Sequence, residues 1–509
     1  MGAPKSKMGE RMDAEPEFDA DVDVREVGTI QSIREFLVTA VGLPSCINGQ
    51  IVEFANGHRG LVMGFKGEQV QILVLGLKVN LRIGDEVFNR SQLLELPVGA
   101  NFLGRIVNSL CEPVDGLGPV QGDAMKSVFA DAPNVMDRIP VDQTTPTGTF
   151  ALDVVIPIAK GQRQLLIGDR LTGKTTVALD AILSQKKTGT ICVYCSIGKP
   201  FTSLTAIIDL LREKGAMPYT IVVDSTSSTS VGEQYLSPYT ACMLGEYFMY
   251  QGKDVIVVFD DLTKHAWTYR QISLLLERAP GREAYPGDIF YVHSQLMERA
   301  AYLKPELKGG SMTFFPIIET LQGDLTSYIP NNIISMTDGQ IYFSSALFYK
   351  GIKPAIDFGL SVSRIGNKAQ WKAMRKLSGD FRLEYLQYQE LLQITRLRAT
   401  GLSEEAQARL KKGEIITHLI SQFKHRPVPL EAQIIFLFAL KLGMLDTLMQ
   451  DGINQFKDEI LPFIQARQPG LIEAVVTTHE LTPDNEDQLG KMLLEYFEES
   501  ANKDIRNMR

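Results

Sequence analysis

The stretch 164–180, QLLIGDRLTGKTTVALD, constrains the fold more than any other part of this chain. Its three apolar residues at 165–167 predict a short buried strand, and the residues from Thr175 onward predict a helix. The loop between them, GDRLTGKT at 168–175, fits the pattern G-x-x-x-x-G-K-[ST] of a phosphate-binding loop. A strand, such a loop and a helix in succession predict an α/β domain that binds the phosphates of a nucleotide.

The residue types in this loop suit that chemistry. Gly168 and Gly173 allow the backbone to curl so that successive N–H groups point at phosphate oxygens. We expect Lys174 to reach the β- and γ-phosphates and the Thr175 hydroxyl to ligate Mg²⁺. The helix adds its free N–H groups and the positive end of its dipole. ATP or ADP with Mg²⁺ is therefore predicted to bind at Gly168, Asp169, Arg170, Leu171, Thr172, Gly173, Lys174 and Thr175.

A second metal-ligating residue is predicted at the end of another strand. Continuous apolar residues at 254–259, DVIVVF, predict a buried strand that is followed by Asp260 and Asp261. Ligands of open α/β sheets bind at the carboxyl ends of the strands, where a carboxylate suits a Mg²⁺ site. The alternative is that Asp260 is only a polar turn residue. Beside a phosphate-binding loop we favour Asp260 as a Mg²⁺ ligand together with Thr175.

The chain of 509 residues is too long for one hydrophobic core, and its pattern of apolar and polar residues changes along its length. Residues 1–26 form an acidic N-terminal tail, and short apolar segments with glycine turns at 27–97 predict a small antiparallel β-barrel. Strands alternating with helices at 98–370 predict a parallel α/β domain, and 371–509 predicts a helical domain. The expected helices include 237–251, 377–400, 404–412, 415–422, 430–449, 454–468 and 485–502.

Composition excludes several classes of protein. The net charge of −8, from 52 basic and 60 acidic residues, argues against a nucleic-acid-binding surface. Five cysteines, an odd number, indicate reduced thiols, and Cys192 and Cys195 should lie on opposite faces of one strand. The richest apolar run, 434–440, is far shorter than the ~20 residues that span a bilayer. We therefore expect contact with a membrane only through partner proteins.

From residue 28 to the C-terminus the chain resembles the α subunit of F-type ATP synthases. The matching motifs are GDRLTGKT at 168–175, GEYF at 245–248, DDLTKHAWTYRQISLLLERAPGREAYPGD at 260–288, DGQIYF at 338–343 and GLSVSRIG at 359–366. The resemblance implies a multidomain α/β fold. An N-terminal β-barrel, a central RecA-like nucleotide domain with the phosphate-binding loop, and a C-terminal helical bundle are expected in that order.

The resemblance also implies function and partners. Such α subunits alternate with catalytic β subunits in a hexameric head around a γ shaft. The delta subunit and peripheral stalk hold this head, and protons or sodium ions crossing a membrane sector drive ATP synthesis. The location implied is the cytoplasmic face of the bacterial inner membrane. Arg364 matches the arginine that reaches into the β site, although a surface salt bridge is its ordinary alternative. Gln422 matches a glutamine that lies beside the adenine ring of the bound nucleotide in this family.

This chain departs from the family at several positions. Lys199 stands where catalytic relatives have Glu and α subunits usually have Gln; an ammonium cannot serve as the base, although it can pair with phosphate. Leu171, Lys353 and Lys424 replace a usual Gln, Arg and Gln, so we expect altered nucleotide affinity and base preference. The acidic segment 1–26 replaces a stalk-docking helix, which predicts weaker or altered stalk attachment.

Two further functions are compatible with the nucleotide domain. One is an autonomous RecA-like hexameric motor of the secretion or helicase type, and the other is a scaffold that has lost nucleotide. Lys199 and the acidic balance disfavour the motor, whereas the intact Gly168, Gly173, Lys174 and Thr175 disfavour the scaffold. We expect the isolated chain to lack ATP turnover of its own.

Overall fold

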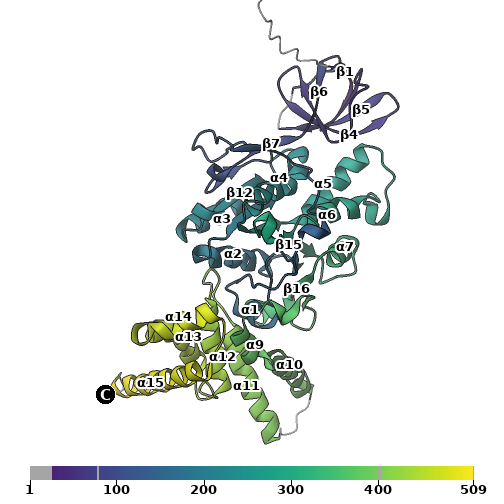
Figure 1. Ribbon diagram of the computed structural model, residues 1–509. Coiled ribbons are helices and arrows are strands. Elements are labelled where there is room, and N and C mark those ends of the chain that lie inside the picture. The colour runs from purple at the N-terminus through teal and green to yellow at the C-terminus, as the bar shows by residue number, and fades with distance from the viewer. Residues whose placement is uncertain (1–25, 77–79, 398–402, 508–509) are drawn as a thin grey trace, which may run out of the picture.

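The computed structural model describes residues 26–76, 80–397 and 403–507. Three parts follow one another along the long direction of the molecule: a β-barrel, a sheet flanked by helices, and a group of helices that holds the C-terminus (Figure 1). This order confirms the fold class predicted from the sequence. The predictions about the acidic tail lie outside the described residues, apart from Glu26.

The N-terminal part is a closed antiparallel barrel with the strand order β1-β2-β5-β4-β3-β6. Alternate residues such as Val38, Val52 and Ile72 point inward and are fully buried, as the pleat of a strand requires. Glu26, placed in the tail by the sequence analysis, is the first residue of β1 and accepts hydrogen bonds from Ser45. The strands are β1 (Glu26–Arg34), β2 (Leu37–Val41), β3 (Gln50–Phe54), β4 (Arg59–Lys66), β5 (Gln69–Leu75) and β6 (Glu86–Leu93).

The central part is built on a sheet whose main order is β17-β16-β10-β15-β13-β11-β12-β8. The neighbours from β16 to β8 pair in parallel, so their carboxyl ends meet at one edge. The strands are β8 (Ile106–Val107), β10 (Gln164–Asp169), β11 (Ile191–Ile197), β12 (Thr220–Ser225), β13 (Asp254–Asp260), β15 (Ser311–Thr320), β16 (Gly339–Phe343) and β17 (Val362–Ser363). β14 (Ala301–Tyr302) pairs with β15, and β7 (Glu95–Val98) pairs with β9 (Ala124–Ser127).

Helices cover both faces of this sheet. One face packs against α2 (Lys174–Ser184) and α3 (Phe201–Glu213), and the other against α4 (Val231–Met249), α5 (Leu262–Leu275), α6 (Ile289–Met297) and α7 (Tyr328–Met336). Cys192 belongs to the first of these cores and Cys195 to the second, and both thiols are free. The prediction that they lie on opposite faces of one strand is therefore confirmed.

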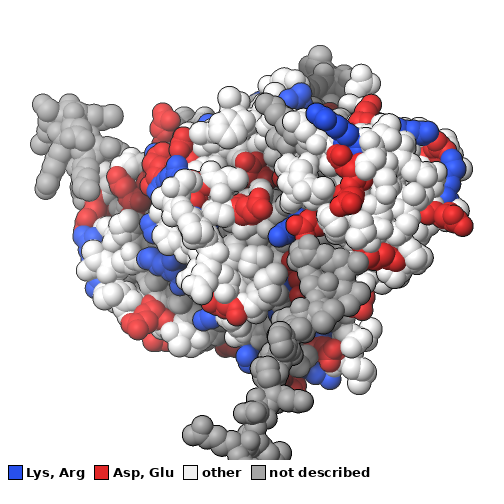
Figure 2. Space-filling model, turned by 90° about the horizontal axis from the view of Figure 1, so that it is seen from above, with Lys and Arg blue, Asp and Glu red and all other residues white. Residues whose placement is uncertain are grey.

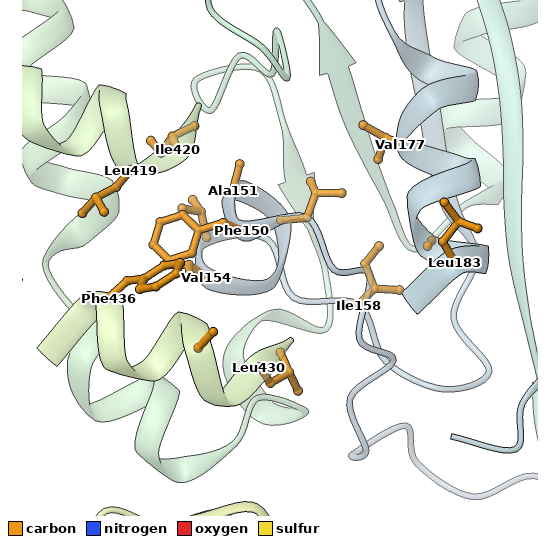
Figure 3. Close-up of a cluster of buried hydrophobic side chains, with 14 of the residues drawn as sticks. Phe150, Ala151, Val154, Ile158, Val177, Leu183, Leu419, Ile420, Leu430 and Phe436 are labelled. Atoms are coloured by element: carbon orange, nitrogen blue, oxygen red, sulfur yellow. The ribbon is translucent and has the colours of Figure 1, made fainter. Parts of the chain in front are cut away.

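The C-terminal helices share their core with the first face of the sheet. Phe150 in α1 (Phe150–Val155) packs against Phe436 with ring centroids 6.0 Å apart, and Leu419 and Ile420 lie nearby (Figure 3). This cluster fastens the helical part to the nucleotide domain. Its helices are α9 (Lys372–Ser378), α10 (Phe381–Leu397), α11 (Glu404–Ile420), α12 (Leu430–Lys441), α13 (Gln450–Arg467), α14 (Pro469–Thr478) and α15 (Pro483–Asn507); α8 (Ser345–Tyr349) precedes them.

Several helix boundaries differ from the predicted ones. The helix predicted at 237–251 begins earlier, because Ser230 and Glu233 form a capping box that starts α4. The helix predicted at 377–400 is divided near Gly379 into α9 and α10, whereas those predicted at 404–412 and 415–422 are the single helix α11. The helix predicted at 430–449 ends at Lys441, and α14 was missed.

On the face seen in Figure 2, acidic and basic side chains are interspersed over the described surface. That mixture agrees with the moderate net charge of −8 and offers no continuous basic track for a nucleic acid on this face. Among the described residues, none of the helices combines the length and the apolar character needed to cross a bilayer.

Replacing Phe436 with alanine should destabilise the junction between the nucleotide domain and the C-terminal helices. The side chain is 1% exposed and touches Phe150 and Phe456, so truncation leaves a cavity and costs about 3–5 kcal/mol. Urea denaturation followed by circular dichroism measures this loss. Leu494→Ala, at a 54% exposed position of α15, is the control and should stay within about 0.5 kcal/mol of the parent. Equal effects of both changes would contradict the packing described.

Candidate nucleotide-binding site

The predicted loop leaves β10 and enters α2 with the backbone that a phosphate cradle requires. Gly168 lies so close to the neighbouring strand that an added Cβ would meet the Phe343 carbonyl oxygen at 2.4 Å. Gly173 caps α2 with a φ of 106°, a left-handed conformation that favours glycine. Leu171 also has a positive φ, of 64°, and its side chain is 83% exposed. The close approach of β16 therefore accounts for Gly168, and the left-handed turn accounts for Gly173.

Two polar loop side chains hold the loop in shape. The Asp169 carboxylate accepts hydrogen bonds from Thr320 Oγ1 at 2.6 Å, from the Gly323 N–H at 2.7 Å and from Ser345 Oγ at 2.8 Å. Thr172 Oγ1 donates to the Asp169 carbonyl at 2.7 Å. These contacts are internal, so Asp169 and Thr172 can contribute to phosphate binding through their backbone N–H groups.

Lys174 lies inside the curl of the loop. Its side chain is buried, and its Nζ donates hydrogen bonds to the carbonyl oxygens of Gly168, at 2.7 Å, and of Asp169. Burial lowers the pKa of Lys174, while the carboxylates of Glu319 and Asp261 oppose that change. The loop thus presents a cation at its centre, as the sequence predicts for a phosphate ligand.

The structure brings Thr175 and Asp260 together. Thr175 Oγ1 donates a hydrogen bond to Asp260 Oδ2 at 2.7 Å, although 85 positions separate the two residues. The same Oδ2 accepts from Tyr194 Oη at 2.8 Å and from Lys199 Nζ at 2.6 Å. Lys199 Nζ also lies 3.1 Å from Thr175 Oγ1. Burial, together with the charge of Asp260, raises the pKa of Tyr194 well above its usual range.

These four side chains do not fit a magnesium ion in the arrangement observed. Magnesium binds oxygen ligands at about 2.0–2.1 Å and keeps several waters. Here an ammonium group contacts both predicted ligand oxygens, at 2.6 Å from Asp260 Oδ2 and 3.1 Å from Thr175 Oγ1. In the described part of the chain, no cluster of three or more His, Cys, Asp or Glu residues could hold a metal ion. The Mg²⁺ assignment of Thr175 and Asp260 remains a sequence prediction.

The loop opens into a cavity of about 680 Å³. Six basic residues line this cavity: Arg170, Lys174, Lys199, Lys264, Lys353 and Lys424. Its acidic lining residues are Asp180, Asp260 and Glu319, and burial raises the pKa of Asp180 to about 7. The cavity is therefore electropositive, which suits a polyanionic ligand.

Part of the cavity lining is apolar or carries an amide group. Phe348 and Phe423 line it, and Lys353 Nζ lies 5.0 Å from the centroid of the Phe348 ring. Gln422 lines it too, but its amide donates to the carbonyls of Gly148 and Arg426 at 2.8 Å and accepts from the Phe150 N–H at 3.1 Å. These bonds fasten the C-terminal helices to α1. The predicted contact of Gln422 with a nucleotide stays a prediction.

Arg364 lies elsewhere. It follows β17, an edge strand separated from β10 by β16, and its backbone N–H donates to the Asp338 carbonyl at 2.8 Å. Its side chain is exposed, is absent from the cavity lining, and forms no ion pair within the described residues. The alternative of an intramolecular surface salt bridge is not observed in this part of the chain.

Sequence reasoning missed Tyr194, Glu319 and Phe348. A hydroxyl inside the buried strand β11 requires a polar partner, and that requirement could have indicated Tyr194. Glu319 is placed by the register of β15, which sets it beside Gly168 of β10, and Phe348 by α8. No local sequence pattern indicates that Glu319 and Phe348 line the cavity.

A phosphate-binding loop at the carboxyl edge of a parallel sheet, facing a strand-end carboxylate, defines the P-loop nucleotide-binding proteins, and this chain is one of them. Two family descriptions match it: the ATP synthase alpha/beta family, nucleotide-binding domain, over residues 148–363, and the ATP synthase alpha/beta chain, C terminal domain, over 370–496. ATP synthase subunit alpha of Caldanaerobacter subterraneus subsp. tengcongensis is 43% identical over 486 residues, which cover 96% of each chain.

The chain therefore belongs to the ATP synthase alpha/beta family and, within it, to the alpha subunits of F-type ATP synthases. This confirms the resemblance read from the sequence motifs. An autonomous secretion or helicase motor is not favoured.

Lys174→Gln should reduce the affinity for ATP. The change removes the buried cation at the centre of the loop while keeping a similar length, and a charge-assisted hydrogen bond contributes about 1.5–3 kcal/mol, or roughly 10- to 150-fold in affinity. Titration of the purified chain with a fluorescent ATP derivative measures it. Lys187→Gln, an exposed lysine outside the cavity lining, is the matched control and should bind normally. Unchanged affinity in the Lys174 variant would contradict this site.

Proposed function

We propose that this chain is the non-catalytic, nucleotide-binding subunit of the head of an ATP synthase. In this role it alternates with catalytic β subunits in a hexameric ring around γ. The ring makes ATP from ADP and phosphate at the expense of a proton or sodium gradient. The relative that is 43% identical carries the name ATP synthase subunit alpha, which supports the assignment of this role.

The observation that carries the non-catalytic part of the proposal is the position of Lys199. ATP hydrolysis needs a group that orients or polarises the attacking water, usually a carboxylate or a glutamine. At the edge of β11 this chain offers an ammonium, whose Nζ is bound to Asp260 Oδ2 at 2.6 Å. A cation already paired with a buried carboxylate cannot accept a proton from water.

Arg364 supplies the contribution to the neighbouring catalytic site. A guanidinium is always charged and can form two parallel hydrogen bonds with phosphoryl oxygens. The side chain is exposed and lies outside the cavity of its own chain, which supports action on a β subunit. In phosphoryl transfer an arginine supplied in this way stabilises the charge of the transition state.

The remaining partners follow from the same role. We propose contacts with β, γ and the delta subunit or peripheral stalk, and no binding of nucleic acid. The assembled complex would place this chain peripherally on the cytoplasmic face of a bacterial inner membrane. The nucleotide, ATP or ADP, would lie with its phosphates on the loop from Gly168 to Thr175 and its base toward Phe348 and Gln422.

Arg364→Ala should abolish multisite turnover of the reconstituted complex. Loss of a charge-stabilising arginine costs about 10³- to 10⁵-fold in rate, and the exposed position should leave folding and nucleotide binding by this chain unchanged. The measurement is steady-state ATP hydrolysis by this chain mixed with β and γ, compared with the unmodified complex.

Arg375→Ala provides a matched control, since Arg375 is another exposed arginine whose side chain forms no ion pair in the described structure. It should leave the rate unaltered. The unmodified chain on its own should show negligible hydrolysis. Full activity of the Arg364 variant, or steady turnover by the isolated chain, would contradict the proposed division of roles.

A further inference from the structure

The buried cluster around Asp260 already contains a cation. Lys199 Nζ contacts Asp260 Oδ2 at 2.6 Å and Thr175 Oγ1 at 3.1 Å, and these are the two oxygens predicted to ligate Mg²⁺. The side chains of Lys199 and Asp260 are only 14% and 2% exposed, so solvent screens their attraction weakly. Asp260 therefore has a charged partner before any metal ion arrives.

The backbone fixes Lys199 in this position. β11 pairs with β13 so that Ser196 is opposite Asp260, and Lys199 follows three residues later, past the end of the strand. Gly198 turns the chain with a φ of 61°, and its N–H donates to the Ser225 carbonyl at 2.7 Å. The Lys199 carbonyl accepts from the Ser227 N–H at 2.8 Å. The turn is held on both sides of the lysine, which limits how far its Cα can move.

A magnesium ion on the same two oxygens would be repelled by the ammonium. It would have to lie at about 2.0–2.1 Å from Asp260 Oδ2, next to a positive charge that is only 2.6 Å from that atom. Besides Lys199 and Asp260, five basic and two acidic residues line the cavity, so its cationic side chains are in excess without a metal ion.

We propose that the Lys199 ammonium takes the place of the divalent cation, so that this chain binds adenine nucleotide as the metal-free polyanion. The inference rests on the proposed nucleotide-binding function and deepens it. The phosphates would be neutralised by Lys174 from within the loop and by Lys199 from the edge of β11. Lys199 is thus a residue that decides which form of the nucleotide, free or metal-bound, the chain selects.

The test is a titration of the full-length chain with a fluorescent N-methylanthraniloyl derivative of ATP, in buffer with excess MgCl₂ and in buffer with EDTA. The unmodified chain should bind the derivative at least about tenfold more weakly in excess MgCl₂ than in EDTA, because Mg²⁺ in solution complexes the free nucleotide that the chain selects. Lys199→Gln should lose about tenfold or more in EDTA and recover with MgCl₂, since the vacated oxygens can then bind the metal. Lys187→Gln should behave like the unmodified chain, and thermal melting checks that every variant is folded.

The titration of the unmodified chain tests the inference by itself, even if the Lys199 variant fails to fold. An affinity in EDTA that is equal to or lower than the affinity in MgCl₂ would overturn the inference while leaving nucleotide binding intact. Absence of saturable binding in both buffers would instead overturn the proposed nucleotide function, and this inference with it.

Discussion

Parallel pairing of β10, β15, β13 and β11 is the constraint on which the site depends. The register sets Gly168 beside Glu319, and Ser196 beside Asp260, so four strand ends meet at one edge. Backbone hydrogen bonds and two buried cores keep this register, because a slip of one residue would exchange the two faces of a strand. The distances between the loop, Asp260 and Lys199 are therefore properties of the sheet and do not depend on mobile surface segments.

The electrostatics of the cavity follow from that arrangement. A lone carboxylate as deeply buried as Asp260 would be costly, and three hydrogen bonds, one of them from an ammonium, offset that cost. The same ammonium removes the group that a catalytic site needs at the end of β11. Lys199 thus pairs with a buried charge, and on our proposals it also disfavours hydrolysis within this chain and sets the preferred form of the ligand. Arg364, exposed just after the edge strand β17, is the residue that we propose to act on another subunit.

The sequence was sufficient where the signal is local. The loop from Gly168 to Thr175 is a contiguous pattern, and Asp260 ends a continuous apolar run, so the position of both at the ends of strands could be predicted. The barrel, α/β and helical parts could be predicted as well. The contact between Lys199 and Asp260 could not be predicted, because it depends on the pairing of β11 with β13. Neighbouring residues in the sequence do not indicate which strands pair in a parallel sheet. Gln422 shows the same limit: its amide is engaged by Gly148 and Phe150, which are about 270 positions away. Helix ends such as those near Gly379 depend on packing, which periodicity does not report.

Electron paramagnetic resonance of Mn²⁺ tests the central claim most directly, since this ion replaces Mg²⁺ and its signal changes on binding. The full-length chain is loaded with ATP, freed of excess nucleotide, and titrated with Mn²⁺. If the Lys199 ammonium occupies the cation position, no Mn²⁺ binds to the nucleotide that the chain retains. Tight binding of one Mn²⁺ per bound nucleotide in the unmodified chain would contradict the account.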